Sequence, residues 1–402
     1  MRLRNRVLTG AGCAALIAAL AGCGSATTTT TTITGTALTI YASVPLAGPE
    51  AAEGHDVLSA EQLALQQAGG KIGVYTIHLV SLNDANSTGW SPKLIAANAR
   101  TVIQQADAIA YLGEIDPNAS AQSIPITNAD DLLQVSPYDT AIGLTQATKA
   151  VPDAPNAYYE ALSTNGRTFG RVVPNDNYQA KAQLQVMQSL GVKKLFIAED
   201  GKAYGDAIAL AVAQNASKYG ITASAPASSG ARLAQSGADA VFYGGVAGPA
   251  AVQLFNGAAS TNPKLKLFGP SGLYTSSFAS QLAPGAQSAT YLSEPGLTPS
   301  ALPAAGTKFL ADFKSAYGHA PWTQAIFGYA AMQAVLHALN QAGGKLNARQ
   351  ADINAFDTAR NVSSVLGTYS IDKNGDTTLA PYVFSRVKGG KLVAYKSLIV
   401  KP

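Results

Sequence analysis

Short apolar runs that alternate with helical segments are the feature that most constrains how this chain folds. Runs of strand length lie at residues 37–43, 74–82 and 108–112, and a helical segment follows each of the first two. Strands and helices that alternate along a chain predict a mostly parallel sheet with helices on both faces. We therefore expect an α/β fold.

A second series with the same alternation predicts a second domain. Between about residues 146 and 168 the pattern lapses into polar sequence, and strands are expected again at residues 193–200, 238–245 and 265–272. At 402 residues the chain is also longer than one hydrophobic core usually reaches. Its hydrophobic fraction of 47% and charged fraction of 13% are typical of a globular protein.

The last third of the chain is expected to be helical at about residues 307–342 and to end in β segments. Asn374 and Gly375 lie between two of these segments, and Asn-Gly in such a place predicts a hairpin turn. The run from Asp372 to Asp376 also has some likeness to a calcium loop. It lacks the Glu that such a loop needs at its twelfth position, so we favour the hairpin.

The stretch at residues 107–140 is the first place where a binding site is expected. It has the pattern of a strand, a loop, a helix, a second strand and a second loop. Asp116 is predicted to cap the helix, with Pro117 as the first helical residue. Loops at the carboxyl ends of strands, one of them feeding a helix N-terminus, are where open α/β sheets bind small ligands.

The N-terminal segment is predicted to export the protein and to anchor it. Residues 1–22 have a basic start and an apolar centre, which is the pattern of a signal peptide. Leu20 to Cys23 resemble the bacterial lipobox, in which Cys23 is lipidated; the alternative is an ordinary signal peptide with a chance cysteine. Residues 23–36 include six consecutive threonines and are expected to be a tether. We expect lipid anchoring at the extracytoplasmic face of the cell membrane.

Several classes of function are disfavoured by composition and motifs. Cys13 and Cys23 are the two cysteines, so the body has no thiolate for a zinc site, and no cofactor or metal is expected. The formal charge is +4, and three arginines of the predicted signal peptide contribute to it, so nucleic-acid binding is not expected. The chain has no GxSxG motif, and we do not expect an enzyme.

The order of motifs along residues 37–401 resembles a known family. The motifs are PLAGPEAAEG, AGG, SLNDANSTGWSPKLIAANARTVIQQ, VSPYDT, FGRVVPNDNYQA, EDGKAYGDAIA, DAVFYGG, FGPSGLY, DKNGD and YVFSRVKGGKLV. They resemble the type I periplasmic binding proteins of the branched-chain amino-acid class, the solute receptors of ABC importers. The resemblance depends on the number and order of these motifs rather than on any one of them.

This resemblance implies two doubly wound α/β lobes that are joined by three crossovers and close on a ligand. The crossovers are expected near Arg171, Pro295 and Leu379. Lobe 1 would then comprise residues 37–170 and 296–379, and lobe 2 residues 171–295 and 380–402. Closure of this kind is a hinge motion, which a ligand drives only through contacts with both lobes.

The family resemblance also implies ligand contacts in both lobes. The SPYDT loop matches an SP-x-x-T element, so Ser136 and Thr140 are expected to bind the ligand by hydrogen bonds. Tyr138 and Asp139 occupy its variable positions, where they either set specificity or are exposed to solvent. Tyr204, in the second lobe, either lines the cleft or packs within its helix.

The loop after the fourth strand departs from the family pattern. The family holds a ligand carboxylate there with hydroxyl and backbone N–H groups, whereas this chain has GEIDPNAS. The Asp116 carboxylate would repel a second anion at that place. Asp116 is therefore either a simple cap or a cleft residue that prefers a cationic or hydrogen-bond-donating ligand. Asn118 and Ser120 are weaker candidates.

Three further positions remain open. The family's amino-acid binders often carry an acid in a GPEG loop, where this chain has Ser271 in GPSG. Glu53 either replaces that acid from the other lobe or is a surface residue. Trp90 either offers an apolar wall to the ligand or packs on its own lobe.

The sequence thus predicts a monomeric, lipid-anchored solute-binding protein that delivers its ligand to the permease subunits of an ABC importer. The ligand is expected to be a small polar solute, an amino acid or an amide-like molecule. Ureas and aromatic acids stay open. The alternative function is a ligand-sensing receptor that acts through a partner protein.

Overall fold

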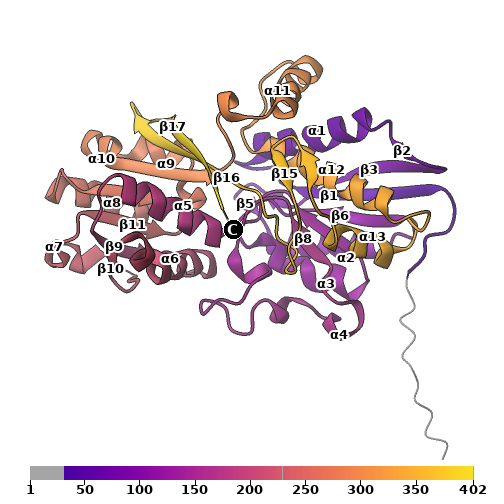
Figure 1. Ribbon diagram of the computed structural model, residues 1–402, viewed down its shortest axis with the longest axis horizontal. Coiled ribbons are helices and arrows are strands. Elements are labelled where there is room, and N and C mark those ends of the chain that lie inside the picture. Colours follow the sequence, from indigo (N-terminus) through magenta and orange to yellow (C-terminus); the bar gives the residue numbers. More distant parts are fainter. Residues whose placement is uncertain (1–30, 229, 402) are drawn as a thin grey trace, which may run out of the picture.

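The structure is a computed structural model that describes residues 31–401 except residue 229. The predicted signal peptide and the predicted lipidation at Cys23 lie outside the described residues. Figure 1 shows two lobes side by side, each built around its own sheet, with α11 (Ala304–Tyr317) at the upper margin of the view. None of the helices among these residues is long and apolar enough to cross a membrane.

Lobe 1 is organised around a six-stranded sheet with the order β2-β3-β1-β6-β7-β8. Neighbouring strands from β3 to β8 pair in parallel, and only β2 is antiparallel to its neighbour. The strands are β1 (Ala37–Val44), β2 (Lys71–Ile72), β3 (Tyr75–Asn83), β6 (Ala108–Leu112), β7 (Leu133–Ser136) and β8 (Phe169–Arg171). A small hairpin of β4 (Ala85–Asn86) and β5 (Gly89–Trp90) follows β3.

Helices from both ends of the chain cover this sheet. Helix α12 (Ala325–Gln341) is buried on nearly all sides, and α1 (Ala51–Gln67) packs against it in one large hydrophobic core. Apolar helix faces that pack on a sheet contribute most of the buried apolar surface that stabilises an α/β fold. The other helices are α2 (Pro92–Ile103), α3 (Ile124–Ala129), α4 (Leu162–Asn165), α11 and α13 (Arg349–Asp357).

Lobe 2 has a seven-stranded sheet with the order β10-β9-β11-β12-β13-β16-β17. The pairs from β10 to β13 are parallel, and β16 and β17 add an antiparallel edge. The strands are β9 (Lys194–Glu199), β10 (Thr222–Ala223), β11 (Ala240–Gly244), β12 (Lys266–Gly269), β13 (Thr290–Pro295), β16 (Ala380–Lys388) and β17 (Lys391–Val400).

Two separate hydrophobic clusters pack against the lobe 2 sheet. One contains side chains of α5 (Asp176–Ser189) and α6 (Ala203–Asn215), and the other contains side chains of α8 (Pro249–Thr261), α9 (Ser276–Gln281) and α10 (Pro284–Ala289). Helix α7 (Leu233–Ser236) is a single turn. The sheet therefore has helices on both faces, which confirms the predicted doubly wound α/β architecture.

The chain passes between the two sheets three times. It leaves lobe 1 after β8, returns after β13, and enters lobe 2 again at β16, after the small β14 (Val362–Ser364) and β15 (Gly367–Tyr369) hairpin. The three passages lie where crossovers were expected, near Arg171, Pro295 and Leu379. Our division at residues 170/171, 295/296 and 379/380 remains a proposal.

Two local predictions are wrong. Asp116 does not cap a helix, because Asn118 adopts a left-handed backbone with φ 65° and a short 3-10 turn precedes α3, which begins only at Ile124. The expected helix at residues 307–342 is two helices, since α11 ends at Gly318 with φ 82° and α12 begins at Ala325.

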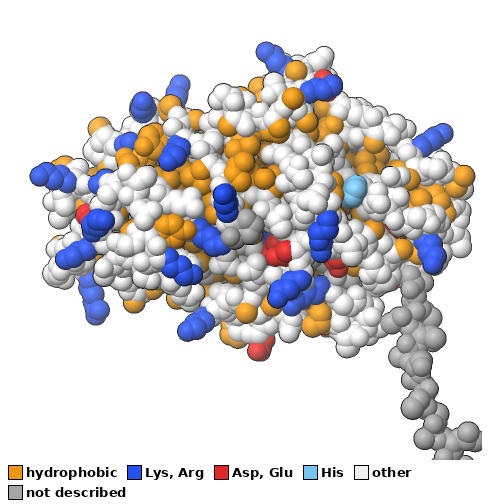
Figure 2. Space-filling model, viewed as in Figure 1, with side chains coloured by type: hydrophobic (Ala, Val, Ile, Leu, Met, Phe, Trp, Pro, Cys, Tyr) orange, Lys and Arg blue, Asp and Glu red, His pale blue; other side chains and the backbone are white. Residues whose placement is uncertain are grey.

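The predicted hairpin turn at Asn374 and Gly375 is confirmed. Ile371 forms an antiparallel bridge with Thr377 across it, and Gly375 has φ 87°, a conformation that favours glycine. On the face in Figure 2, Lys and Arg side chains are scattered over both lobes rather than gathered in one patch.

Candidate ligand-binding site between the lobes

The carboxyl ends of four neighbouring strands in lobe 1 all lead to acidic side chains. Glu50 follows β1, Asp84 follows β3, Glu114 and Asp116 follow β6, and Asp139 follows β7. Because these strands are parallel neighbours, their carboxyl ends meet at one edge of the sheet, where open α/β sheets bind ligands. We call Glu50, Asp84, Glu114 and Asp116 the acid cluster.

Asp84 and Glu114 form a fully buried carboxyl pair within the acid cluster. The Tyr111 hydroxyl donates to Glu114 Oε1 at 2.8 Å, and the Glu114 N–H donates to Ser120 Oγ at 3.2 Å. Burial raises the pKa of Glu114 to about 7; burial, the Glu114 charge and a hydrogen bond between the two carboxyls raise the pKa of Asp84 to about 9. At neutral pH the pair therefore retains a proton.

Asp116 is a half-buried carboxyl with an unsatisfied oxygen. No described residue forms a hydrogen bond with its Oδ2. Burial raises the pKa of Asp116 well above its usual value, and the charges of Glu50, Asp84, Asp139 and Glu53 raise it further. The side chain thus lies among acids without a cationic partner, which is an unfavourable place for a carboxylate.

The start of α1 brings Glu50 and Glu53 to the same edge. The helix approaches the loop after β1 so closely that a Cβ at Gly54 would lie 1.8 Å from the Pro45 carbonyl oxygen. Glu53 is half-buried, and its charge raises the pKa of both Asp116 and Glu50. Trp90 is half-buried in the β4–β5 hairpin. Burial raises the Glu50 pKa, and the Trp90 backbone N–H lowers it by a smaller amount.

Asp139 occupies the backbone N–H groups of the GEIDPNAS loop. Its Oδ1 accepts from the N–H groups of Asn118 at 2.8 Å and Ala141 at 3.2 Å, and its Oδ2 accepts from the Ser120 N–H at 2.8 Å. Asp139 is fully buried, and burial raises its pKa although these N–H groups lower it. This is the loop that the family resemblance assigned to a ligand carboxylate. We call the three N–H groups the anion seat.

The hydroxyls of Ser136 and Thr140 are engaged within the protein. Ser136 Oγ donates to the Glu114 carbonyl oxygen at 2.6 Å and accepts from the Asp139 N–H at 2.8 Å. Thr140 Oγ1 donates to Asp176 Oδ2 at 3.1 Å, and this bond joins lobe 1 to the first turn of α5 in lobe 2. Both residues therefore fix the loop after β7 in place.

In lobe 2, the side chains of Tyr204 and Ser271 lie next to each other. Their hydroxyl oxygens are 3.1 Å apart, the Gly272 N–H donates to the Tyr204 hydroxyl at 3.0 Å, and Ser271 donates to Gln179 Oε1 at 3.3 Å. Gln179 in turn donates to Ser293 at the end of β13. These bonds hold the carboxyl ends of the lobe 2 strands in one polar network.

Tyr138 reaches from lobe 1 toward lobe 2. Its ring packs against Trp322 and Phe327, with centroids 5.8 Å and 5.5 Å away, and its buried hydroxyl has no hydrogen-bond partner among the described residues. Burial, then the charge of Glu294, raises the Tyr138 pKa. Tyr138 and Asp139 are both buried, so the alternative of solvent exposure is wrong for both.

Two acids of lobe 2 face this region with unsatisfied oxygens. Asp176 is 1% exposed and Glu294 is 2% exposed, and neither Asp176 Oδ1 nor Glu294 Oε1 has a hydrogen-bond partner in the described chain. Burial raises both pKa values. For Asp176 the nearby Arg171 charge lowers the pKa and the Asp139 charge raises it, so the two lobes act on each other electrostatically.

A second group of buried charges lies at the first crossover and is fully paired. Arg171 Nε donates to Asp376 Oδ1 at 2.7 Å, and its other nitrogens donate to Thr145 Oγ1 and to two backbone carbonyls of the SPYDT-containing loop. Asn175 donates to the second Asp376 oxygen at 2.8 Å. We call Arg171, Asp376, Thr145 and Asn175 the crossover node.

Sequence reasoning missed Glu50, Asp84, Glu114, Asp176 and Glu294. Asp84 and Glu114 each follow an expected strand within one or two residues, so a survey of acids at strand ends would have found them. In the described chain, no three His, Cys, Asp or Glu side chains are arranged to hold a metal ion.

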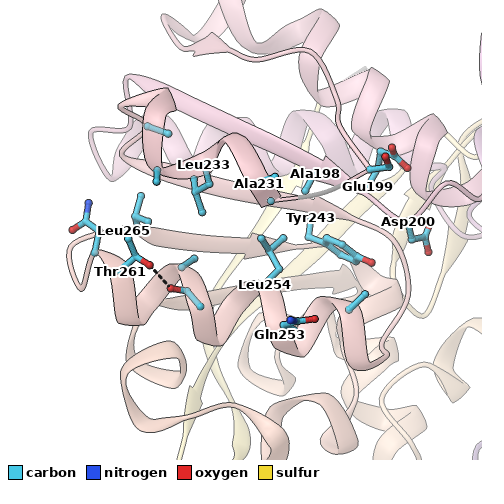
Figure 3. Close-up of a pocket in the computed structure, with 18 of the residues that line it drawn as sticks. Ala198, Glu199, Asp200, Ala231, Leu233, Tyr243, Gln253, Leu254, Thr261 and Leu265 are labelled. Atoms are coloured by element: carbon cyan, nitrogen blue, oxygen red, sulfur yellow. Dashed lines mark hydrogen bonds between the residues drawn. The ribbon is translucent and has the colours of Figure 1, made fainter.

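A pocket lies elsewhere, within lobe 2. It has a volume of about 930 Å³ between β9, β11 and α8, and its described lining includes none of the side chains predicted from the sequence. Figure 3 shows Glu199, Asp200 and Tyr243 at one end of it and apolar side chains such as Leu233 and Leu254 along it. Polar groups from both lobes come together at the strand ends described above.

Comparison with known proteins identifies the family. A family model described as periplasmic binding protein matches residues 38–391. The Leu/Ile/Val-binding protein BraC3 of Rhizobium johnstonii is 26% identical over 374 residues, which cover 89% of this chain and 93% of that protein. The Leu/Ile/Val-binding protein of Citrobacter freundii is 26% identical over 345 residues, or 82% of this chain and 85% of that one.

Solved structures share the fold. The leucine-binding protein LivK of Thermotoga maritima has a TM-score of 0.71 at 20% identity and covers 91% of this chain and 99% of its own. A solute-binding protein of an ABC transporter from R. palustris, in complex with benzoate, has a TM-score of 0.68 at 19% identity, with 91% and 97% covered. The family match spans most of the chain, which therefore belongs to the periplasmic binding protein family and has its type I fold.

Proposed function

We propose that this chain captures a small polar solute between its lobes and delivers it to the permease subunits of an ABC importer. The observation that carries the proposal is the convergence of polar groups from both lobes at the strand ends. Tyr138 and Asp139 approach from lobe 1, and Asp176 and Glu294 approach from lobe 2. A solute held there contacts both lobes, which is the condition for ligand-driven closure.

The predicted binding residues divide into two roles in this proposal. Ser136, Thr140 and Ser120 are positioning residues, because their polar atoms hold the loops after β6 and β7. The other predicted residues contact the solute or shape its surroundings; they are Glu53, Trp90, Asp116, Asn118, Tyr138, Asp139, Tyr204 and Ser271.

The solute class is an amino acid or an amide-like molecule. Two relatives are named as Leu/Ile/Val-binding proteins and one structural neighbour holds benzoate, so the fold accepts more than one kind of solute. The apolar face of Tyr138, backed by Trp322 and Phe327, offers contact to an uncharged part of the solute. Binding by closure needs no covalent chemistry.

We further propose that the protein is a monomer tethered to the extracytoplasmic face of the cell membrane by lipid on Cys23. Mass spectrometry of the mature chain tests this anchor. An acylated N-terminal Cys23 is expected, and Cys23→Ser should release the protein from the membrane fraction. An unmodified N-terminus at another residue would contradict the anchor and leave the binding proposal intact.

Thermal unfolding of the purified mature protein tests solute capture. A panel of amino acids, amides, ureas, amines and aromatic acids is added one at a time. A solute at 100 times its Kd stabilises the folded state by roughly 2.7 kcal/mol, which raises the Tm by several degrees for a protein of this size. If no member of the panel raises the Tm, the proposed function is wrong.

A further inference from the structure

The three backbone N–H groups of the anion seat already donate to a side chain of the protein itself. The N–H groups of Asn118, Ser120 and Ala141 all donate to the Asp139 carboxylate at 2.8–3.2 Å. A carboxylate that accepts three backbone N–H bonds has its charge-assisted hydrogen bonds satisfied. A ligand carboxylate would have to displace Asp139 from a fully buried position to use the same donors.

The surroundings of the filled seat are acidic. Asp116 Oδ2 and Glu50 Oε2 are buried oxygens without a hydrogen-bond partner in the described chain. None of the ion pairs found among these residues involves a member of the acid cluster. A second anion placed here would lie beside the Asp139 carboxylate and several other acids, which disfavours binding.

Lobe 2 also has two buried acids with an oxygen that lacks a hydrogen-bond partner among the described residues. Asp176 Oδ1 and Glu294 Oε1 come from α5 and β13, are almost fully buried, and lack hydrogen-bond donors within the described residues. Arg171, whose charge acts on Asp176, is already paired with Asp376 at 2.7 Å. Buried polar atoms are nearly always satisfied in native proteins, so these oxygens are able to accept hydrogen bonds from a ligand.

We propose that the cleft binds an organic cation without a free carboxylate, such as an amine, amidine or guanidine, and that Asp139 excludes carboxylate ligands by filling the anion seat. The cation donates hydrogen bonds to Asp116 from lobe 1 and to Asp176 or Glu294 from lobe 2. An uncharged part of the ligand packs against Tyr138. The inference rests on the proposed solute capture and departs from its solute class, because an amino acid carries the carboxylate that Asp139 excludes.

Compounds that share one isobutyl group test the charge requirement. Leucine carries an ammonium and a carboxylate, leucinamide and 3-methylbutylamine carry only the cation, and 4-methylpentanoate carries only the anion. Agmatine adds a guanidinium. Titration calorimetry and thermal unfolding of the mature protein are expected to show binding of at least one cation, and binding of leucine and 4-methylpentanoate weaker by roughly 100-fold or more.

The outcomes separate this inference from the proposed function. If leucine or another carboxylate binds tighter than every amine, amidine and guanidine, the inference is overturned and solute capture stands. If a calcium or magnesium ion raises the Tm and no organic cation does, the inference is also overturned. If no solute of any class binds, the proposed function fails and the inference fails with it.

Substitution of Asp139 tests the filled seat directly. Asp139→Ala vacates three N–H groups, so acetate is expected to raise the Tm of this variant by several degrees and to leave the wild-type Tm unchanged. Asp239→Ala is the matched control, because Asp239 also accepts backbone N–H groups, from Lys193 and Lys194, but at an exposed site. An equal acetate effect on both variants would overturn the inference.

A second variant keeps the test decisive if Asp139→Ala does not fold. Asp116→Asn removes an unpaired charge and breaks no hydrogen bond of Oδ2. It is expected to weaken cation binding by roughly tenfold or more, as for the loss of one charged hydrogen bond. Cation binding that is unchanged in Asp116→Asn would show that the cation lies elsewhere.

Discussion

The crossover node and the acid cluster are two groups of buried charges with opposite states of pairing. In the crossover node every hydrogen-bonding atom of the Asp376 carboxylate has a partner, and Arg171 donates to Asp376, Thr145 and two carbonyls. In the acid cluster, carboxyl groups lie beside one another and retain unpartnered oxygens.

The pairing in the crossover node indicates a structural role, and we propose that the acid cluster is available to a ligand. The crossover node joins the start of lobe 2 to the turn at residues 372–376, so its pairing holds two of the segments that pass between the lobes together. The acid cluster is stabilised by protonation instead, as its raised pKa values indicate. A ligand can supply the missing positive charge there, whereas the node has no place for one.

The largest expected effect is the loss of the node. Asp376→Ala leaves the Arg171 guanidinium buried and unpaired, and removal of one partner of a buried ion pair destabilises a protein by about 3–5 kcal/mol. Urea unfolding measures this change. Asp312→Ala is the control, because its pair with Lys308 is largely exposed and its loss should have a much smaller effect. If Asp376→Ala and Asp312→Ala lower the free energy of unfolding equally, the crossover node stabilises the protein no more than an exposed ion pair does.

The acid cluster should make stability fall as the pH rises. The folded protein holds protons on Asp84 and Glu114 that the unfolded chain releases near pH 3.8 and 4.5, so stability is greatest below those values and declines toward about 7 and 9. The expected slope is up to about 1.4 kcal/mol per pH unit for each such proton. Urea unfolding at pH 5 and pH 8 measures it.

Asp84→Asn sharpens the same test. The amide supplies a permanent N–H donor to Glu114, so the decline between pH 5 and pH 8 should become shallower than in the wild type. Glu160→Gln changes an exposed acid and should leave the slope unchanged. If Asp84→Asn and the wild type show parallel slopes, the carboxyl pair does not share a proton.

Asp116→Asn is expected to stabilise the ligand-free protein by about 1 kcal/mol at pH 8, since the amide removes the cost of holding a proton on a carboxyl with a raised pKa. The same variant should bind cations more weakly, so the two effects have opposite signs. We expect higher stability together with weaker cation binding for this substitution in the acid cluster, and not for substitutions in the crossover node. A variant that is less stable than the wild type would contradict it.

The smallest expected effect is in the polar network of lobe 2. Ser271→Ala removes one hydrogen bond to Tyr204 and one to Gln179, both at distances above 3.0 Å, and should lower stability by about 1 kcal/mol or less. Thermal unfolding measures the change. A loss as large as that of Asp376→Ala would place Ser271 among the structural residues.

Much of the fold could be predicted from the sequence because its signals are local. The strand expected at residues 108–112 is β6 (Ala108–Leu112), since five apolar residues that end at a glycine determine it. The helix at Asp116 could not be predicted correctly, because the left-handed backbone of Asn118 depends on the Asp139 carboxylate that accepts its N–H. The break at Gly318 did have a local signal, with Pro321 close behind it.

The site could be located but not interpreted from the sequence. The SPYDT loop was expected to offer the hydroxyls of Ser136 and Thr140 to a ligand. Their partners, the Glu114 carbonyl and the Asp176 carboxylate, are 22 and 36 residues away and are found only in the folded structure. The resemblance implied the family's contacts, and the geometry shows that the Asp139 carboxylate accepts the backbone N–H groups of Asn118 and Ser120.

Calorimetric titration of the mature protein with 3-methylbutylamine and with leucine, in two buffers of different ionisation enthalpy, tests the central claim most directly. A cation that contacts Asp116 and Asp176 lowers their raised pKa values. The charges of Glu50, Glu53, Asp84 and Asp139 continue to raise the Asp116 pKa, and the Asp139 charge continues to raise the Asp176 pKa. The expected result is amine binding with proton release, tighter at pH 8 than at pH 6, and no leucine binding at the same concentration. Leucine binding that is tighter than amine binding, without proton release, would contradict it.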